Sequence, residues 1–279
     1  EGGALVEREF RVADLSSAEM LRRLGTENTP ELSLMRGLLA CEAKNMAAAA
    51  KEFGQAGPGL GAAVARRCAK DGMRVAVASR TTAKVAAVAK SIGAAARAYP
   101  CDATKPEDVA ALFAAVTKDL GEPDLVVFNA GAYAPGNVLE IDPKEFERCW
   151  RNGAFGGFLV AQAAGRQMVA RGNGTILLTG ATASLRGGAR FLNLAIGKFG
   201  LRAVAQSFAR DLGPKGVHVA HIVIDGQIES DRPGYSAGER GEDAVLSPDA
   251  IAETYLQLHH QHRSAWTQEI DVRPWVEKF

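Results

Sequence analysis

A glycine-rich turn carries the clearest chemical signal in the sequence. Gly57-Pro58-Gly59-Leu60-Gly61 stands directly before a run of helix-forming residues that begins at Ala62. Such a turn lets backbone N–H groups approach a pyrophosphate at the positively polarised start of a helix. A glycine cluster alone is a weak signal, because a tight loop in an alanine-rich chain has the same composition. Its context therefore decides its meaning.

Ser79 and Arg80 end a short apolar run that follows this helix. They stand at the distance where dinucleotide-binding folds select their cofactor. An acidic residue at this point binds the ribose 2′-hydroxyl of NAD(H), whereas an arginine favours the 2′-phosphate of NADP(H). Arg80 therefore predicts NADP(H) as the cofactor.

The elements that must position these residues alternate between strand and helix from Gly57 onward. Short β-rich runs cover Met73 to Ser79, Ala95 to Tyr99, Asp124 to Asn129, Gly174 to Gly180, Val217 to Asp225 and Glu269 to Val272. Helical patterns occupy 60–71, 83–92, 106–120, 143–171, 190–213 and 248–260. This alternation predicts an α/β fold with a doubly wound parallel sheet. Residues 1–50 read as a helical N-terminal extension, and residues 51–279 as the sheet domain.

Further motifs follow the glycine turn in a fixed order. They are Cys101-Asp102-Ala103, Asn129-Ala130-Gly131-Ala132, Asn152, Lys198 and the tail Glu269 to Trp275. Together they resemble the short-chain dehydrogenase/reductase family over roughly residues 54–279. The resemblance implies a Rossmann-like fold, with Lys198 as the active-site lysine and Asn152 holding a water in the proton relay.

The same resemblance implies a set of cofactor contacts. Asp102 would contact the adenine, the backbone of Ile228 the nicotinamide carboxamide, and Ser230 the pyrophosphate. The full set is Gly57, Gly59, Leu60, Gly61, Ser79, Arg80, Asp102, Ala103, Asn129, Ala130, Gly131, Lys198, Ile228 and Ser230.

Two departures from the family pattern concern the chemistry itself. The family's tyrosine, four residues before the lysine, is Leu194 here, and its serine is Ala181. Leucine has no proton to donate and alanine no hydroxyl, so the usual general acid and the polarising donor are both missing. Thr182 and Ser184 are neighbouring hydroxyls that could substitute, although a shift in position re-aims a side chain.

A third departure lies before the glycine turn. Gln55 replaces the glycine that ends the family's first strand, and Met46 to Phe53 is a helix-forming stretch with two charges. A central parallel strand is normally apolar. Either the first strand is poor or the chain reaches the glycine turn from a helix, and both weaken the phosphate cradle. Binding of NADP(H) stays open at this point.

Two hypotheses follow. In the first, the chain is a catalytically degenerate member that retains at most NADP(H) binding and acts as a structural, accessory or regulatory subunit. In the second, it is an active NADP(H)-dependent oxidoreductase that reduces a carbonyl or activated alkene, with Lys198, a water on Asn152 and Thr182 supplying protons.

The helices at 143–171 and 190–213 carry Gly153, Gly156, Gly157, Gly165, Gly197 and Gly200 in their interiors, and glycine is unfavourable inside a helix by about 1 kcal/mol relative to alanine. Close helix approach would offset that cost. In the resembling family these helices form a dimer interface, so we expect a homo-oligomer or a protein partner in a larger assembly. The alternative is that the glycines only let the helices pack within the chain.

Composition excludes several other classes of protein. With 33 Lys+Arg against 32 Asp+Glu, the chain has no net field to hold a nucleic acid. No apolar run approaches the 18 to 20 residues, roughly, of a membrane helix. His259, His260 and His262 lack a carboxylate or cysteine at ligand spacing, so we expect a solvated helix end and no metal. The four cysteines lack a CxxC pair and indicate a reducing compartment, either cytoplasm or an organelle matrix such as the mitochondrial one.

Overall fold

The computed structural model describes residues 59–230, 235–241 and 243–276. All of them belong to the second of two units, Gly57–Phe279. The described residues do not include the expected extension at 1–50, nor Gly57 and Pro58 of the glycine turn. They also do not include the stretch before this turn, where the first strand was in question. The division at residue 50 therefore stays a prediction.

The predicted alternation of strands and helices is confirmed in the described part of the chain. The strands are β1 Val75–Ser79, β2 Ala96–Pro100, β3 Leu125–Phe128, β4 Gly174–Thr179, β5 Val217–Ile224 and β6 Glu269–Val272. The helices are α4 Leu60–Lys70, α5 Thr82–Ile92, α6 Pro106–Leu120, α7 Pro143–Trp150, α8 Gly156–Arg171, α9 Leu192–Leu212, α10 Ala237–Arg240 and α11 Pro248–His259. The segment between β5 and α11 contains the short helix α10.

Every strand pairing among the described residues is parallel. β1 pairs with β2, and the second group runs in the order β3-β4-β5-β6. β4 and β5 are buried along their whole length, as the central strands of a parallel sheet are. All carboxyl ends in each group thus lie on one edge.

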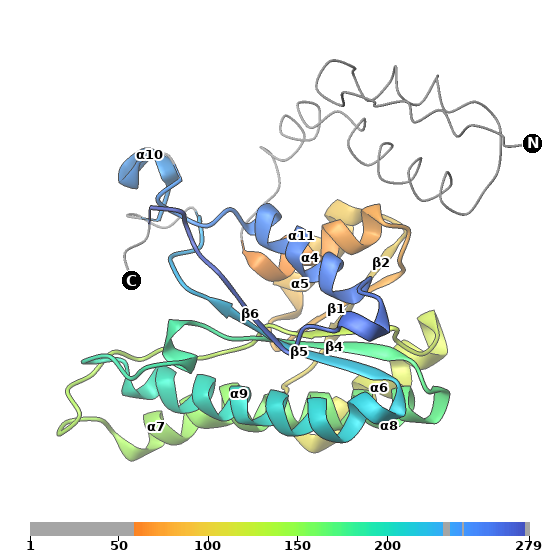
Figure 1. The fold of residues 1–279 in the computed structure, drawn as a ribbon, viewed down its shortest axis with the longest axis horizontal. Helices are drawn as coiled ribbons and strands as arrows, with labels where there is room; N and C mark the ends of the chain where they lie inside the picture. The colour runs from red at the N-terminus through yellow and green to blue at the C-terminus, as the bar shows by residue number, and fades with distance from the viewer. Residues whose placement is uncertain (1–58, 231–234, 242, 277–279) are drawn as a thin grey trace, which may run out of the picture. The chain divides into compact units, whose positions relative to one another are not determined.

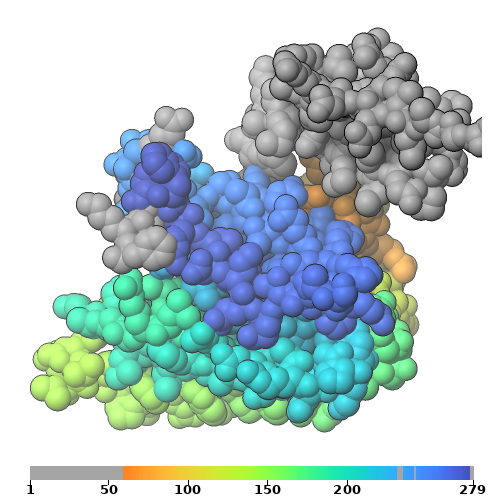
Figure 2. Space-filling model, in the orientation of Figure 1, coloured from red at the N-terminus to blue at the C-terminus, as the bar shows by residue number. Residues whose placement is uncertain are grey.

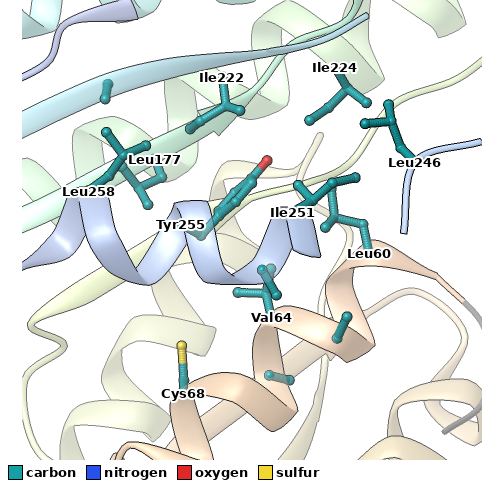
Figure 3. Close-up of a cluster of buried hydrophobic side chains, with 14 of the residues drawn as sticks. Leu60, Val64, Cys68, Leu177, Ile222, Ile224, Leu246, Ile251, Tyr255 and Leu258 are labelled. Atoms are coloured by element: carbon teal, nitrogen blue, oxygen red, sulfur yellow. The ribbon is translucent and has the colours of Figure 1, made fainter. Parts of the chain in front are cut away.

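Helices cover both faces of the strands (Figure 1). One core joins α4 and α11 to alternate residues of β4 and β5, including Leu177 and Ile222, and it also holds Tyr255 (Figure 3). The other core joins α6, α8 and α9 to the residues between, including Ile176 and Leu178. This is the doubly wound architecture that the sequence predicts. None of the helices in the described ranges is long and apolar enough to cross a membrane.

The single helix predicted over 143–171 is wrong in its middle. α7 ends at Trp150, a π-helical turn covers Arg151–Phe155, and α8 then continues. Asn152 Nδ2 donates a hydrogen bond to the carbonyl of Arg148 at 2.7 Å, inside this wider turn. Apolar periodicity does not reveal a π turn, because the inserted residue leaves the pattern on each side intact. Such turns often occur at functional sites.

The helix glycines pack within the chain. A Cβ on Gly153 would lie 2.7 Å from the Cα of Gly197, and one on Gly157 would lie against the Leu201 side chain. Close approach of α8 and α9 to each other accounts for these glycines. The expected oligomer stays a prediction, and the glycines no longer support it.

Candidate active site

The residues singled out in the sequence lie at the carboxyl ends of the parallel strands. Ser79 and Arg80 close β1, Asp102 and Ala103 follow β2, and Asn129 to Gly131 follow β3. Arg80 and the Asn129 to Gly131 segment are exposed. Ligands of open α/β sheets bind outside this edge.

The start of α4 is open to an anion. Gly59 has φ +101°, and among the described residues no side chain caps the helix and no acidic residue stands in its first turn. A Cβ on Gly61 would come within 3.2 Å of Asn129 Nδ2, so the residue must be small. The first N–H groups of a helix have no partner within it. Among the described residues, the backbone N–H groups of Gly59, Leu60 and Gly61 therefore have no hydrogen-bond acceptor, and Gly61 lies beside Asn129.

Asp102 is an ionised carboxylate beside Arg80. Burial alone would raise its pKa, but hydrogen bonds from the backbone N–H and the hydroxyl of Thr104 outweigh that effect. The charges of Arg80 and Lys105 also lower the pKa below its ordinary value. The ends of β1 and β2 thus carry one exposed guanidinium and one fixed carboxylate.

Ile228 and Ser230 lie beyond β5 in half-buried positions. Ile228 forms an isolated bridge with Leu246, and the N–H of Ser230 donates to the carbonyl of Tyr235 at 3.0 Å. Ile228 and Ser230, just after β5, are therefore tied to Leu246 and Tyr235 in the segment that leads to α11.

Lys198 is the central cation of the site. It lies on α9, is only 8% exposed, and its Nζ donates to the carbonyl oxygen of Thr179 at 2.7 Å. Burial lowers its pKa from 10.5 to about 8. A Cβ on Gly131 would lie 3.4 Å from Nζ, so Lys198 reaches the end of β3. Among the described residues it pairs with no carboxylate.

The positions of the two missing hydroxyls both precede this lysine in the chain. Leu194 lies one helical turn before Lys198 on α9, and Ala181 follows β4; both are half-buried. Thr182 Oγ1 donates to Asp225 Oδ1 at 2.5 Å, and Asp225 pairs with Arg273 at 3.3 Å. The proton of Thr182 is therefore engaged by a carboxylate in this arrangement.

His221, on β5, is a buried polar residue that the sequence analysis did not assign to the site. Its Nδ1 lies 3.0 Å from Glu269 Oε2, and Glu269 accepts two hydrogen bonds at 2.6 Å from Arg202. Burial lowers the pKa of His221, which keeps the ring neutral. The pairing joins α9, β5 and β6, and only a three-dimensional register places these residues together.

The space beside Gly180 is filled by two polar atoms. A Cβ on Gly180 would overlap His221 Nε2 and would lie 2.8 Å from Ser184 Oγ. Ser184 Oγ accepts a hydrogen bond from the backbone of Ala181 at 3.1 Å, and Ser184 is fully buried. The hydroxyl of Ser184 therefore lies under residue 181 and is closed to solvent.

Tyr255 is the second residue that sequence analysis did not assign to the site. Its hydroxyl lies 2.7 Å from Thr179 Oγ1, on the opposite face of the sheet from Lys198. Figure 3 shows the ring rising from α11 toward β4 and β5. Burial raises the pKa of this fully buried phenol. Tyr255 is therefore a structural partner of Thr179 and a poor proton donor for the cleft.

Two further histidines and three cysteines have structural surroundings. His218 stacks on Trp266 with ring centroids 5.0 Å apart, and His259 hydrogen-bonds Thr175 at 2.9 Å. Cys68, Cys101 and Cys149 are buried free thiols. The described residues contain no group of three potential metal ligands.

The fold and this edge define a class of protein: a doubly wound α/β domain with a buried lysine near the carboxyl ends of its parallel strands. The family model for short chain dehydrogenases matches residues 55–232, more than half of the chain. The chain belongs to the short-chain dehydrogenase family.

Curated relatives include reductases of several kinds. The short-chain reductase NovJ of Streptomyces niveus is 32% identical over 224 residues, covering 78% of this chain and 85% of NovJ. The 3-oxoacyl-[acyl-carrier-protein] reductase MabA of Mycobacterium tuberculosis is 31% identical over 62% of this chain, and the match spans 66% of MabA.

Solved structures give the same fold. A short-chain dehydrogenase from Rhodopseudomonas palustris is 37% identical, with a TM-score of 0.67 over 77% of this chain and 93% of that one. A 3-ketoacyl-(acyl-carrier-protein) reductase from Brucella melitensis, complexed with NADH, is 27% identical with a TM-score of 0.69, covering 78% of this chain and 93% of that one.

Proposed function

We propose that this chain is an NADP(H)-dependent oxidoreductase that reduces a carbonyl or activated alkene, with Lys198 as the proton donor in place of a tyrosine. The observation that carries the proposal is the buried ammonium of Lys198, which faces Gly131 at the open edge without a described carboxylate partner. Burying an unpaired charge costs free energy that a purely structural lysine would not justify.

The described residues fit the dinucleotide. Gly59, Leu60 and Gly61 offer backbone N–H groups to the pyrophosphate at the uncapped start of α4, and exposed Arg80 suits the 2′-phosphate. Asn129 to Gly131, Asp102 with Ala103, and Ile228 with Ser230 surround the same edge. When bound, NADPH supplies the hydride.

Lys198 would supply the proton. Its bond to the Thr179 carbonyl uses one of three N–H groups and fixes the direction of the other two. A pKa of about 8 lets the ammonium form predominate at neutral pH while the proton leaves readily. The exposed segment around Gly131 gives solvent access for reprotonation. Asn152, held in the π turn, is the proposed site of a relay water.

The first test concerns the cofactor. We expect NADPH to bind in a fluorescence titration, and Arg80→Ala to weaken NADPH by ten- to a hundredfold, roughly, as for loss of a charge-assisted hydrogen bond. NADH affinity should be unchanged by this variant. Arg97→Ala is the control, because this arginine on β2 pairs with Asp119 at 3.4 Å. Equal effects on NADPH and NADH would contradict the role of Arg80.

The second test concerns the lysine. We expect NADPH-dependent turnover on a carbonyl panel that declines as pH rises through about 8, since the acid form of Lys198 is then lost. Lys198→Met should abolish turnover, and the exposed Lys118→Met on α6 should retain it. Full turnover by Lys198→Met would refute the proposed role.

A second candidate is a cofactor-binding subunit without turnover, favoured by Ala181 and Leu194 at the two hydroxyl positions. NADPH binding with silence across the panel supports this candidate. The variant Ala181→Ser with Leu194→Tyr then distinguishes the cause. Gain of reductase activity means that only those groups were lost.

A further inference from the structure

An aromatic pair lies at the mouth of the candidate active site. The rings of Tyr133 and Phe191 stack with centroids 5.3 Å apart and planes 20° apart. They remain 50% and 42% exposed. Tyr133 comes two residues after Gly131, which faces Lys198, and Phe191 is the N-cap residue of α9, the helix that carries Lys198. The pair is therefore close in the chain to the segments that carry the candidate site.

Hydrogen bonds fix the two loops that carry these rings. Asn193 Nδ2 donates to the carbonyl of Ala134 at 2.9 Å, and the N–H of Gly136 donates to the carbonyl of Arg190 at 3.3 Å. Arg190 has φ +68°, a left-handed conformation that costs a non-glycine residue free energy and that occurs at ligand clamps and active sites. The Oδ1 atom of Asn193, a residue only 2% exposed, lacks a hydrogen-bond partner among the described residues. The rings are thus held in place beforehand.

Apolar and basic side chains are exposed close to the pair in the chain. Leu185, in the segment between β4 and α9, and Leu192, at the start of α9, are 39% and 38% exposed, and Arg186 and Arg190 are exposed beside them. Figure 2 shows the yellow-green loop between β3 and α7 projecting beside this green segment. Leu194 on α9 and Ala181 after β4 are half-buried apolar residues at the positions where the family pattern has two hydroxyls.

We propose that Tyr133 and Phe191 bind a flat aromatic group of the substrate, which makes an aryl carbonyl compound the substrate class of this site. An aromatic ring of the substrate would stack on the exposed pair. It would have no polar group to remove from water beside Leu194 and Ala181. The inference rests on the proposed oxidoreductase for the reaction, but the ring-binding site is testable without turnover.

The experiment compares two methyl ketones that differ in the group beside the carbonyl. The probes are 2-acetylnaphthalene and cyclohexyl methyl ketone, titrated by ligand-observed NMR into the whole chain with and without NADP+. We expect the naphthyl ketone to bind more tightly. Phe191→Leu and Tyr133→Leu keep apolar bulk but lose the ring face, so each should weaken it about fivefold. Val138→Ala, on the same loop and 60% exposed, is the matched control.

The effect of the two leucine variants should be non-additive, because the rings form one stacked unit. Equal affinity for the two ketones, or wild-type affinity in Phe191→Leu with an unchanged melting temperature, overturns the inference. Ring-dependent binding without any turnover upholds the aromatic site while the oxidoreductase proposal fails. Turnover with equal kcat/KM for both ketones supports the oxidoreductase proposal and overturns the aromatic site.

Discussion

At the scale of single residues, the buried charge of Lys198 lowers the free energy of unfolding, and this loss can be measured. Its ammonium is buried, hydrogen-bonded to one carbonyl, and unpaired among the described residues. The folded pKa is about 8 and the ordinary value 10.5. Between these values the unfolded chain binds more protons than the folded one, so stability rises with pH there. Below about pH 8 the full penalty applies.

We therefore expect Lys198→Met to be more stable than the natural chain at pH 7, by about 2 kcal/mol. The pKa difference corresponds to about 3 kcal/mol, and the lost hydrogen bond offsets about 1. The gain should shrink as pH rises from 8 toward 10. Urea unfolding at several pH values measures it, with Lys118→Met as the control. A destabilised Lys198→Met at pH 7 would show that the charge is compensated.

The sequence predicted the helix that carries Lys198, but it did not predict the polar pairs that the fold brings together. Lys198 lies on α9, where the sequence predicted a helix, whereas His221 and Glu269, 48 residues apart, meet only through the pairing of β5 with β6. No local pattern marks such a pair. Thr182 illustrates a second limit, since the sequence could not show that its hydroxyl donates to Asp225.

At the scale of elements, the π turn at Arg151–Phe155 sets how α8 meets α9. The alternation of β-rich runs and helical patterns predicted the strands and helices, and the structure shows the side chains of Asp142 and Ser247 capping α7 and α11. The turn could not be predicted, because its cause is tertiary: Gly153 lies against Gly197 at a distance that excludes any side chain.

Gly153→Ala tests this contact. The new Cβ would lie 2.7 Å from the Gly197 Cα, and backbone cannot yield as a flexible side chain does. We expect a loss of about 2 to 3 kcal/mol in the free energy of unfolding, as for overpacking of a core. The control is Gly187→Ala, where a Cβ meets nothing within 4 Å and stability should change little. A melting temperature of Gly153→Ala equal to that of the control would contradict the tight contact.

At the scale of the whole molecule, the open question is the assembly. Aromatic side chains follow one another along α7, α8 and α9: Trp150 stacks on Phe155, Phe155 on Phe158, and Phe158 meets Phe208 edge-on. Trp150 is 38% exposed. Apolar surface of this kind favours association.

We expect a homodimer in solution through these helices, measured by light scattering after size exclusion. Phe199→Arg should shift the particle to monomer, since Phe199 on α9 is 41% exposed and a buried unpaired charge is costly. Leu139→Arg, at a position 90% exposed before α7, should leave the dimer intact. A natural chain that is monomeric in solution would contradict the predicted homodimer.

Thr179 binds two partners, one through its backbone carbonyl and the other through its side-chain hydroxyl. Its carbonyl holds Lys198 and its hydroxyl meets Tyr255. In evolution these two bonds should behave differently. Any residue at 179 keeps a carbonyl, so side-chain replacement leaves the bond to the lysine chemically available, whereas the hydroxyl contact ties positions 179 and 255 together. We expect relatives to exchange Thr–Tyr for an apolar pair as a unit, while the lysine persists independently of either choice.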